Sequence, residues 1–188
     1  MHLLAGLGNP GREYAATRHN IGFLFIDYLA RRFGISLKSE KKWEAELGRG
    51  VLWDSPVMLV KPQTFMNRSG LAVGRIAHFY QIPPARVVIV HDELDLPFMR
   101  TRMAVDRGPG GHNGVRSVIE HLGSREFVRF RVGVGRPAVP MEAADYVLSR
   151  FSAPEEEQLA ELFPRLEEGL RLLLRQGSTA AMNHLNAP

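Results

Sequence analysis

The residues best suited to chemistry lie near the start of the chain, where a glycine-rich turn leads into a predicted helix. The run GLGNPGREYAATRHN occupies residues 6–20 and carries Asn9, Tyr14 and His19. An amide, a phenol and an imidazole on a tight turn that enters a helix are groups from which a hydrolytic site can be built. The glycines of this run are interpreted as residues that permit the turn, because glycine adopts backbone angles closed to other residues.

The same run also has the glycine spacing of a dinucleotide-binding fingerprint. Gly6, Gly8 and Gly11 spell G-x-G-x-x-G directly after an apolar stretch. That fingerprint needs a helix that begins within the glycines, so that its amide groups hold a pyrophosphate. Here the apolar helical period begins only at Ile21, and Asp27 lies within the helix rather than at the end of a second strand. The interpretation as a cofactor-binding turn is therefore rejected.

Two further loops rich in polar residues follow strand-like runs. The first reads KPQTFMN at 61–67, and the second reads HDELD at 91–95. Because open α/β sheets bind ligands at the carboxyl ends of their strands, we expect both loops to converge with the opening turn on one cleft. The run GGHNG at 110–114 opens the next helix and is expected to lie nearby.

Strands and helices alternate along the chain in a pattern that predicts an α/β fold. Strand-like runs lie at 2–7, 46–53, 57–61, 86–91, 99–105 and 127–134, and helical periodicity covers 20–33, 69–80 and 112–122. A last helix is expected to begin near Ser152 with a capping box completed by Glu155, to kink at Pro164 and to stop at Gly177. We expect a single domain over 1–188, built as a sandwich with a twisted mixed β-sheet flanked by helices.

The composition narrows the class of protein. A chain of 188 residues that is 45% hydrophobic fits one domain with a sizeable core. No apolar run approaches the roughly 20 residues that span a bilayer, and no signal-peptide pattern is present, so we expect a soluble cytoplasmic protein without a membrane partner. The lack of cysteine excludes disulfides and thiolate nucleophiles. A net charge of +4, carried mostly by arginine, indicates phosphate contacts and a nucleic-acid partner.

Four motifs, in this order, resemble those of the bacterial-type peptidyl-tRNA hydrolases. They are GLGNPGREYAATRHN at 6–20, KPQTFMNRSG at 61–70, HDELDLP at 91–97 and GGHNG at 110–114, and FVRFRVGVGRP at 127–137 also fits. The resemblance runs from the first strand to the last helix. It implies hydrolysis of the ester that joins a peptide, or an N-blocked amino acid, to the terminal ribose of tRNA, with no metal and no cofactor.

The resemblance implies that His19 is the general base and that Asp92 is its partner. Histidine titrates near physiological pH and therefore suits the activation of water against an ester. A carboxylate at Asp92 would orient the imidazole ring, fix its tautomer and stabilise the imidazolium as the proton arrives. His91, at a strand end, is expected to be a structural, hydrogen-bonded residue. Glu93 and Asp95 are expected to hold their loop in shape.

Three asparagines are implied to contact the substrate, since each offers both a donor and an acceptor. By resemblance, Asn9 helps to distinguish a blocked aminoacyl end from a free one, and Asn67 contacts the substrate near the scissile ester. Asn113 is implied to hold the attacking water or the tRNA end. A turn or cap residue is the alternative role for each asparagine.

Four other residues of the motifs have implied or alternative roles. Tyr14 and Phe65 are implied contacts to the tRNA end, where a base can stack on an aromatic ring. Met66 is expected either to line the path of the peptide or to fill core space. His112, just before a predicted helix, is expected either to bind phosphate or to cap the helix.

In each of two predicted strands, two arginines lie on the same face of the strand. Alternation along 127–134 places Arg129 and Arg131 opposite the apolar residues, and Arg100 and Arg102 share a face of the run 99–105. Together they could form a platform that positions RNA through phosphates without reading its sequence. The alternative for each arginine is a solvated strand face.

By resemblance, Arg102 and Arg131 are the best matches to the basic clamp of the family. The family often has another basic residue two positions after Arg102, where this chain has Ala104. We expect Arg100 or Arg107 to compensate for it.

Two other classes of function remain open from the sequence. One is a non-catalytic RNA-binding module that uses the same basic face. The other is a metal-dependent peptidase or amidase, although a metal site built from His91, Asp92, Asp95 and His112 lacks a recognised ligand spacing such as HExxH. A serine hydrolase is disfavoured because no G-x-S-x-G elbow is present. The protein is expected to act as a monomer.

Overall fold

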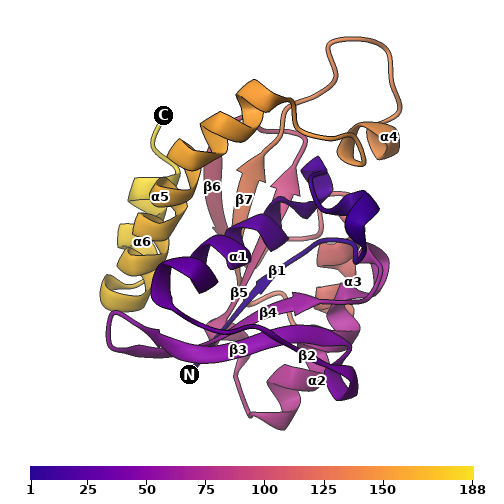
Figure 1. Cartoon of the computed structure of the whole chain (residues 1–188). Coiled ribbons are helices and arrows are strands. Elements are labelled where there is room, and N and C mark those ends of the chain that lie inside the picture. The colour runs from indigo at the N-terminus through magenta and orange to yellow at the C-terminus, as the bar shows by residue number, and fades with distance from the viewer.

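A twisted seven-stranded sheet forms the centre of the computed structural model, which describes residues 1–188 (Figure 1). Its strand order is β2-β3-β4-β1-β5-β7-β6. The strands are β1 (His2–Gly6), β2 (Lys38–Glu40), β3 (Ala45–Leu52), β4 (Ser55–Pro62), β5 (Val87–Glu93), β6 (Thr101–Val105) and β7 (Val128–Gly133). Strands β4, β1, β5 and β7 are parallel, whereas the pairs β2–β3, β3–β4 and β6–β7 are antiparallel. The expected mixed sheet and its six expected strands are confirmed, and only β2 was not predicted.

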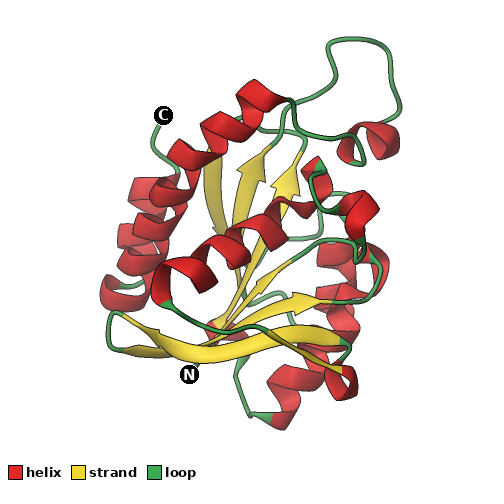
Figure 2. Ribbon diagram, viewed as in Figure 1, coloured by secondary structure: helices red, strands yellow, loops and turns green.

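Five of the six α-helices cover the two faces of the sheet, and the short α4 lies beyond the ends of the strands (Figure 2). They are α1 (Ile21–Phe33), α2 (Ser69–Phe79), α3 (Asn113–Leu122), α4 (Ala143–Val147), α5 (Ala153–Gln176) and α6 (Ser178–Leu185). Helix α5 begins with the predicted capping box between Ser152 and Glu155 and continues through Pro164 as one helix. Helix α6, which follows Gly177 directly, was not predicted. None of the helices has the length and apolar character needed to cross a lipid bilayer.

Side chains of the central strands alternate between two hydrophobic cores. In β1, Leu4 belongs to the core that α1, α5 and α6 complete, whereas Leu3 and Ala5 belong to the core completed by α2 and α3. The same alternation divides Val88 from Ile89 in β5. Because both faces of β1 and β5 are covered, these strands read as continuous apolar runs that end in polar residues.

Helix α1 lies very close to the ends of β1 and β5, and glycines make this approach possible. A Cβ atom on Gly22 would overlap the carbonyl oxygen of Val90, and one on Gly6 would overlap the carbonyl oxygen of Gly22. Gly8 likewise leaves no room for a side chain. Among Gly6, Gly8, Gly11 and Gly22, only Gly11 has a left-handed backbone angle, with φ at 108°. The interpretation of these glycines as turn residues is therefore right for Gly11. It is wrong for Gly6 and Gly8, whose lack of a side chain leaves room for α1 to pack against them.

The glycine run does not begin a helix. Two short 3-10 turns, Arg12–Tyr14 and Arg18–Asn20, separate it from α1, which starts only at Ile21. The helix therefore does not begin within the glycine run, as the helix of a dinucleotide-binding turn does. The expected start of the helix at Ile21 is confirmed, and the second 3-10 turn carries His19 to the carboxyl edge of the sheet.

Candidate active site

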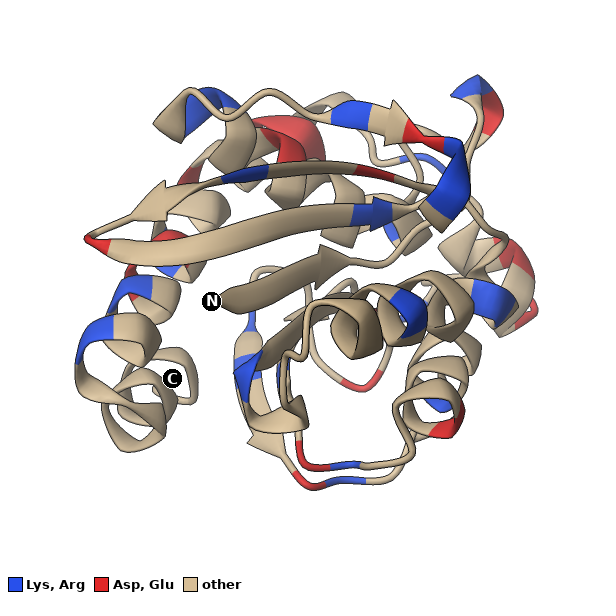
Figure 3. Cartoon of the chain, turned by 90° about the horizontal axis from the view of Figure 1, so that it is seen from below, with Lys and Arg blue, Asp and Glu red and all other residues tan.

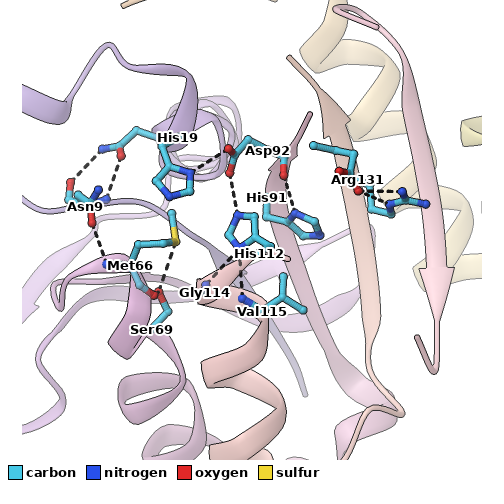
Figure 4. Close-up of polar contacts among 12 residues, drawn as sticks. Asn9, His19, Met66, Ser69, His91, Asp92, His112, Gly114, Val115 and Arg131 are labelled. Carbon is cyan, nitrogen blue, oxygen red and sulfur yellow. Dashed lines mark hydrogen bonds and ion pairs between the residues drawn. The ribbon is translucent and has the colours of Figure 1, made fainter. Parts of the chain in front are cut away.

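Asp92 lies near the carboxyl end of the central strand β5, and its side chain is only 3% exposed. Its Oδ2 atom is 2.8 Å from Nδ1 of His19, and its Oδ1 atom is 2.8 Å from Nε2 of His112 (Figure 4). Parallel pairing of β1 with β5 brings the loop after β1 to the same edge of the sheet. The loop after β1, the loop after β5 and the start of α3 thus converge as predicted.

Helix α3 fixes the proton position on His112. The Nδ1 atom of His112 accepts hydrogen bonds from the backbone N–H groups of Gly114 and Val115, at 3.1 and 3.2 Å (Figure 4). A ring nitrogen that accepts from two amides carries no hydrogen, so the hydrogen of this ring lies on Nε2. His112 therefore donates from Nε2 to Asp92. The expectation that His112 caps a helix is confirmed.

The remaining oxygen of Asp92 orients His19. Since His112 donates to Oδ1, Oδ2 is the acceptor for the Nδ1–H group of His19. The other ring nitrogen of His19, Nε2, has no hydrogen-bond partner in the protein. The side chain is 16% exposed and borders a cleft. In the neutral ring of His19 the hydrogen thus lies on Nδ1 and the lone pair of Nε2 faces the cleft, which is the arrangement a general base needs.

Asp92 is held in its ionised form. Burial alone would raise its pKa, but attraction to His19 and His112, and the hydrogen bonds that both rings donate, lower the pKa below its ordinary value of 3.8. A buried carboxylate that remains charged at neutral pH keeps the proton of His19 on Nδ1. It also stabilises the imidazolium that forms when Nε2 takes up a proton.

A cleft of about 490 Å³ opens beside these three residues. One side of it is formed by the segment that contains α4, whose alanines and Val147 give it an apolar surface. The other side carries polar side chains from the loops after β1 and β5 and from the start of α3. The residues expected at the active site that line it are Asn9, His19, Asp92, His112 and Asn113.

The amide of Asn9 is oriented by its neighbours. The backbone N–H of Asn9 donates to Oδ1 of Asn20, and Nδ2 of Asn20 donates back to the carbonyl oxygen of Asn9, both at 2.9 Å. The backbone N–H of Met66 donates to Oδ1 of Asn9 at 2.7 Å (Figure 4). Because its oxygen is occupied, Asn9 has its Nδ2–H₂ group left for a ligand. The role of Asn20 was not predicted, although its place directly before a helix is typical of a cap residue.

The other residues implied to contact substrate lie outside the cleft wall. Met66 is buried in the core beneath α2 and α3, which confirms its expected packing role. Phe65 and Asn67 are exposed at the 3-10 turn Met66–Arg68 and its edge. Tyr14 is half-buried on the turn after β1. Contacts of Tyr14, Phe65 and Asn67 with substrate therefore stay predictions.

A second hollow of about 590 Å³ lies over β6 and β7 and shares part of its wall with the cleft. We call it the basic groove, because its cationic lining residues are Arg102, Arg107, Arg129 and Arg131. Arg102 and Arg131 are direct cross-strand partners, and Arg131 pairs with Glu93 at 2.7 Å (Figure 4). Arg100 lies outside the groove, so of the two arginines expected to compensate for Ala104 only Arg107 is in place.

Elsewhere the positive charge is dispersed. Lys and Arg lie on helices, strands and loops and are mixed with Asp and Glu (Figure 3). The net charge of +4 is therefore spread over the surface, and the basic groove is where arginines gather beside the cleft.

His91 links the cleft to the basic groove. Its Nδ1 atom donates to the backbone oxygen of Asp92 at 2.8 Å, and its Nε2 atom accepts from Nε of Arg129 at 3.2 Å. Burial is the main cause that lowers the pKa of His91 well below its ordinary value of 6.5, and the positive charge of Arg129 lowers it further. The expectation of a structural, hydrogen-bonded histidine is confirmed.

The ligand atoms of His19, Asp92 and His112 all lie within 4.8 Å of one another, a spacing that suits a metal ion. Both ring nitrogens of His112 are, however, already engaged by Asp92 and by the amides of α3. His91 is likewise engaged by Asp92 and Arg129, so the set considered from the sequence does not form a ligand cluster. The three residues form a hydrogen-bonded network in which Asp92 serves two histidines.

Both the sequence and the fold are similar to those of known proteins. The family model described as peptidyl-tRNA hydrolase matches residues 3–188. The peptidyl-tRNA hydrolase of Chloroflexus aurantiacus is 46% identical over 187 residues, covering 99% of both chains. That of Mycolicibacterium vanbaalenii is 46% identical over 185 residues, or 98% of this chain and 96% of the relative. The crystal structure of the Acinetobacter baumannii enzyme superimposes with a TM-score of 0.93 at 39% identity, covering 100% of this chain and 95% of that one. The chain therefore belongs to the bacterial-type peptidyl-tRNA hydrolase family.

Proposed function

We propose that this protein hydrolyses the ester between a peptide, or an N-blocked amino acid, and the terminal ribose of tRNA, and so recycles tRNA. Family membership supports the class of reaction. The single observation that carries the mechanism is the orientation of His19, whose Nδ1–H is bound to buried Asp92 while Nε2 is free at the cleft.

In the proposed reaction, Nε2 of His19 takes a proton from a water molecule as the water oxygen bonds to the ester carbonyl carbon. Asp92 stabilises the imidazolium that results. The tetrahedral intermediate then expels the ribose oxygen, which receives the proton from His19. The products are a peptide with a free carboxyl group and a tRNA with its terminal hydroxyl restored.

Asn9 and Asn113 are the polar residues that face the substrate in this proposal. The Nδ2–H₂ group of Asn9 is free to donate to a carbonyl oxygen of the peptide, because its own oxygen is held by Met66. A blocked aminoacyl end presents such a carbonyl, whereas a free amino group does not. Asn113, at the start of α3, lies where it can hold the water or the ribose.

The reaction is proposed to be independent of a metal. The hydrogen bonds of 2.8 Å that join Asp92 to His19 and His112 place hydrogens where a metal ion would need lone pairs. Binding of an ion between these atoms would require His112 to release the amides of Gly114 and Val115. The capped geometry of α3 therefore favours a metal-free base.

The basic groove is proposed to receive phosphates of the tRNA acceptor end. It adjoins the cleft, so a tRNA whose ester reaches His19 places its nearest phosphates over β6 and β7. Contacts through arginine to phosphate position RNA without reading its sequence, as an enzyme that serves all tRNAs needs. The cytoplasmic location and the monomeric state stay predictions.

The test is turnover of N-acetylaminoacyl-tRNA by the protein and its His19→Ala variant. Loss of the base is expected to lower kcat by about 10³-fold or more, while tRNA affinity changes little. His78→Ala, which removes an exposed histidine of α2, is the matched control. Turnover of His19→Ala close to that of the control would overturn the mechanism.

The same assay separates the alternatives. Inhibition of the parent protein by a chelator, reversed by a divalent cation, would indicate the metal-dependent hydrolase. Binding of tRNA without any ester cleavage would indicate an RNA-binding module. Aminoacyl-tRNA with a free amino group is expected to be a poor substrate.

A further inference from the structure

Arg18, the residue directly before His19, is a buried cation whose side chain binds one distant segment of the chain. Its Nη1 atom donates to Oγ of Ser149 and to the backbone oxygen of Arg150, at 2.8 and 2.5 Å. Its Nη2 atom pairs with Oε1 of Glu155 at 2.8 Å. The residue is only 9% exposed. Because the guanidinium is planar and rigid, three partners at fixed places hold this side chain in one position.

The backbone around Arg18 strengthens this link. Residues 16–18 and residues 149–151 run antiparallel, with one β-bridge at the centre and backbone hydrogen bonds of 3.1 Å on both sides of it. We call these two paired stretches the clasp. The guanidinium of Arg18 also lies over the ring of Tyr146 in α4, 4.6 Å from its centre. The hydroxyl of Tyr146 donates to the backbone oxygen of Val134 at 2.7 Å, so Arg18 contacts the residue that ties α4 to the end of β7.

The clasp joins the two sides of the cleft. In one of its stretches, Arg18 is followed at once by His19, the proposed base. In the other, Ser149 comes directly after Val147 and Leu148, which belong to the apolar wall that α4 gives the cleft. Helix α4 has only five residues and packs against the turn that carries His19. The base and the wall are therefore neighbours of the clasp in the sequence as well as in space.

The position of His19 depends on contacts on three sides. Asp92 directs the ring through Nδ1. Asn20 exchanges hydrogen bonds with the backbone of Asn9 and so holds the turn to the loop after β1. Neither contact reaches α4. The spacing between His19 and the α4 wall therefore depends on the third contact, which is the clasp of Arg18.

We propose that Arg18 is a positioning residue, which locks the turn of His19 to the α4 wall so that a substrate side chain in contact with this wall aligns its ester with Nε2 of His19. Because the wall is apolar, the side chain that it receives is apolar. Binding that aligns the reacting atoms raises kcat rather than only lowering KM. This inference rests on the proposed function, because Arg18 acts through the base of that reaction.

The test combines two substrates with two proteins. N-acetylleucine and N-acetylglycine are esterified to the same tRNA, so that the substrates differ only in the side chain that reaches the wall. In the parent protein, kcat is expected to be about tenfold or more higher for the leucyl substrate. In Arg18→Met, the ratio of the two kcat values should fall to about twofold or less. KM for both substrates should stay within about twofold, because the basic groove is unchanged.

A destabilised variant without contact to the cleft separates positioning from a loss of stability. Leu170→Ala opens a cavity in the core beneath α5, in the half of the helix that lies away from Ser152. Measured below the melting temperatures of both variants, Leu170→Ala is expected to keep the kcat ratio of the parent. If Arg18→Met lowers kcat by the same factor for both substrates, or for neither, Arg18 is a structural residue and the proposal is overturned.

The remaining outcomes are also decisive. If Arg18→Met does not fold, Arg18→Lys replaces it, because one ammonium group can pair with Glu155 but cannot also hold the backbone of Arg150. A kcat ratio in Arg18→Lys equal to that of the parent overturns the proposal. Equal kcat values for the two substrates in the parent overturn it as well, since no contact with the wall then reaches the base. A parent protein that cleaves neither substrate contradicts the proposed function instead.

Discussion

Replacement of Asp92 by asparagine tests whether the two histidines act through one carboxylate. The variant keeps the size and shape of the side chain but turns one oxygen into an amide nitrogen that only donates. His112 determines which way the new amide turns. Its hydrogen is fixed on Nε2 by the amides of Gly114 and Val115, so it needs an acceptor at the position of Oδ1. The oxygen of the substituted side chain must therefore face His112, and its NH₂ group must face His19.

This orientation forces His19 into the wrong tautomer. Its Nδ1 atom, 2.8 Å from Asp92 in the parent protein, must then accept a hydrogen bond, so the hydrogen moves to Nε2 at the cleft. That nitrogen can no longer take a proton from water. A base locked in the wrong tautomer costs about 10³ to 10⁴ in kcat in a comparable His–Asp pair, or about 4 to 5 kcal/mol in the activation barrier. The basic groove is unchanged, so KM for tRNA is expected to stay within about twofold.

Two measurements check this reasoning. Single-turnover hydrolysis of N-acetylaminoacyl-tRNA gives the rate loss, with Asp54→Asn at an exposed turn as the control. NMR of ¹⁵N-labelled histidine reports the tautomer, which should be Nδ1–H for His19 in the parent and Nε2–H in Asp92→Asn. A variant with nearly normal kcat, or one in which His19 keeps its hydrogen on Nδ1, would refute the coupling through His112.

Three further predictions concern stability. Gly22→Ala should lower the free energy of unfolding by about 2 kcal/mol or more, because its Cβ would overlap the Val90 oxygen; an unchanged melting temperature would contradict this contact. Arg18→Met should lower the free energy of unfolding by about 2 kcal/mol, because Arg18 binds Glu155 at 2.8 Å and so joins the turn that carries His19 to α5. A decrease below about 0.5 kcal/mol in thermal unfolding would argue against that connection. The folded state lowers the pKa of Asp92, so its contribution to stability is complete above the ordinary value of 3.8 and is lost as the pH falls below it. The free energy of unfolding should therefore fall less steeply with decreasing pH in Asp92→Asn than in the parent protein. Equal slopes in the two proteins would contradict this prediction.

The elements that could be predicted from the sequence are those with a buried apolar face. Strands β1 and β5 read as apolar runs because both of their faces are covered, and α5 has both a capping box and a long apolar stripe. Strand β2 has the sequence KSE and is exposed throughout, so no apolar residue marks it. Helix α6 follows directly after Gly177, which is a typical stop signal, and only Ala181 and Leu185 of it are buried.

The active site could be predicted only in part. His19 and Asp92 are 73 positions apart, and their pairing was implied by the resemblance of four motifs rather than by spacing. Alternation correctly placed Arg129 and Arg131 on one face of β7. The pattern could not show that Arg129 is buried, because its depth depends on His91 and Gly108, which only the fold brings together.

Asp92 connects the cleft to the basic groove through hydrogen bonds. Its two carboxylate oxygens accept from His19 and His112, and its backbone oxygen accepts from His91, which in turn accepts from Arg129. The contacts of His91 with the Asp92 backbone and with Arg129 lie within the paired strands β5 and β7. Their distances are set by the register of these strands rather than by the conformation of a loop. Arg129 in the basic groove is therefore held at a constant separation from the carboxylate that orients His19. Because a functional site on strands is more rigid than one on loops, we expect a tRNA bound in the basic groove, as proposed, to present its ester to Nε2 of His19 in one position.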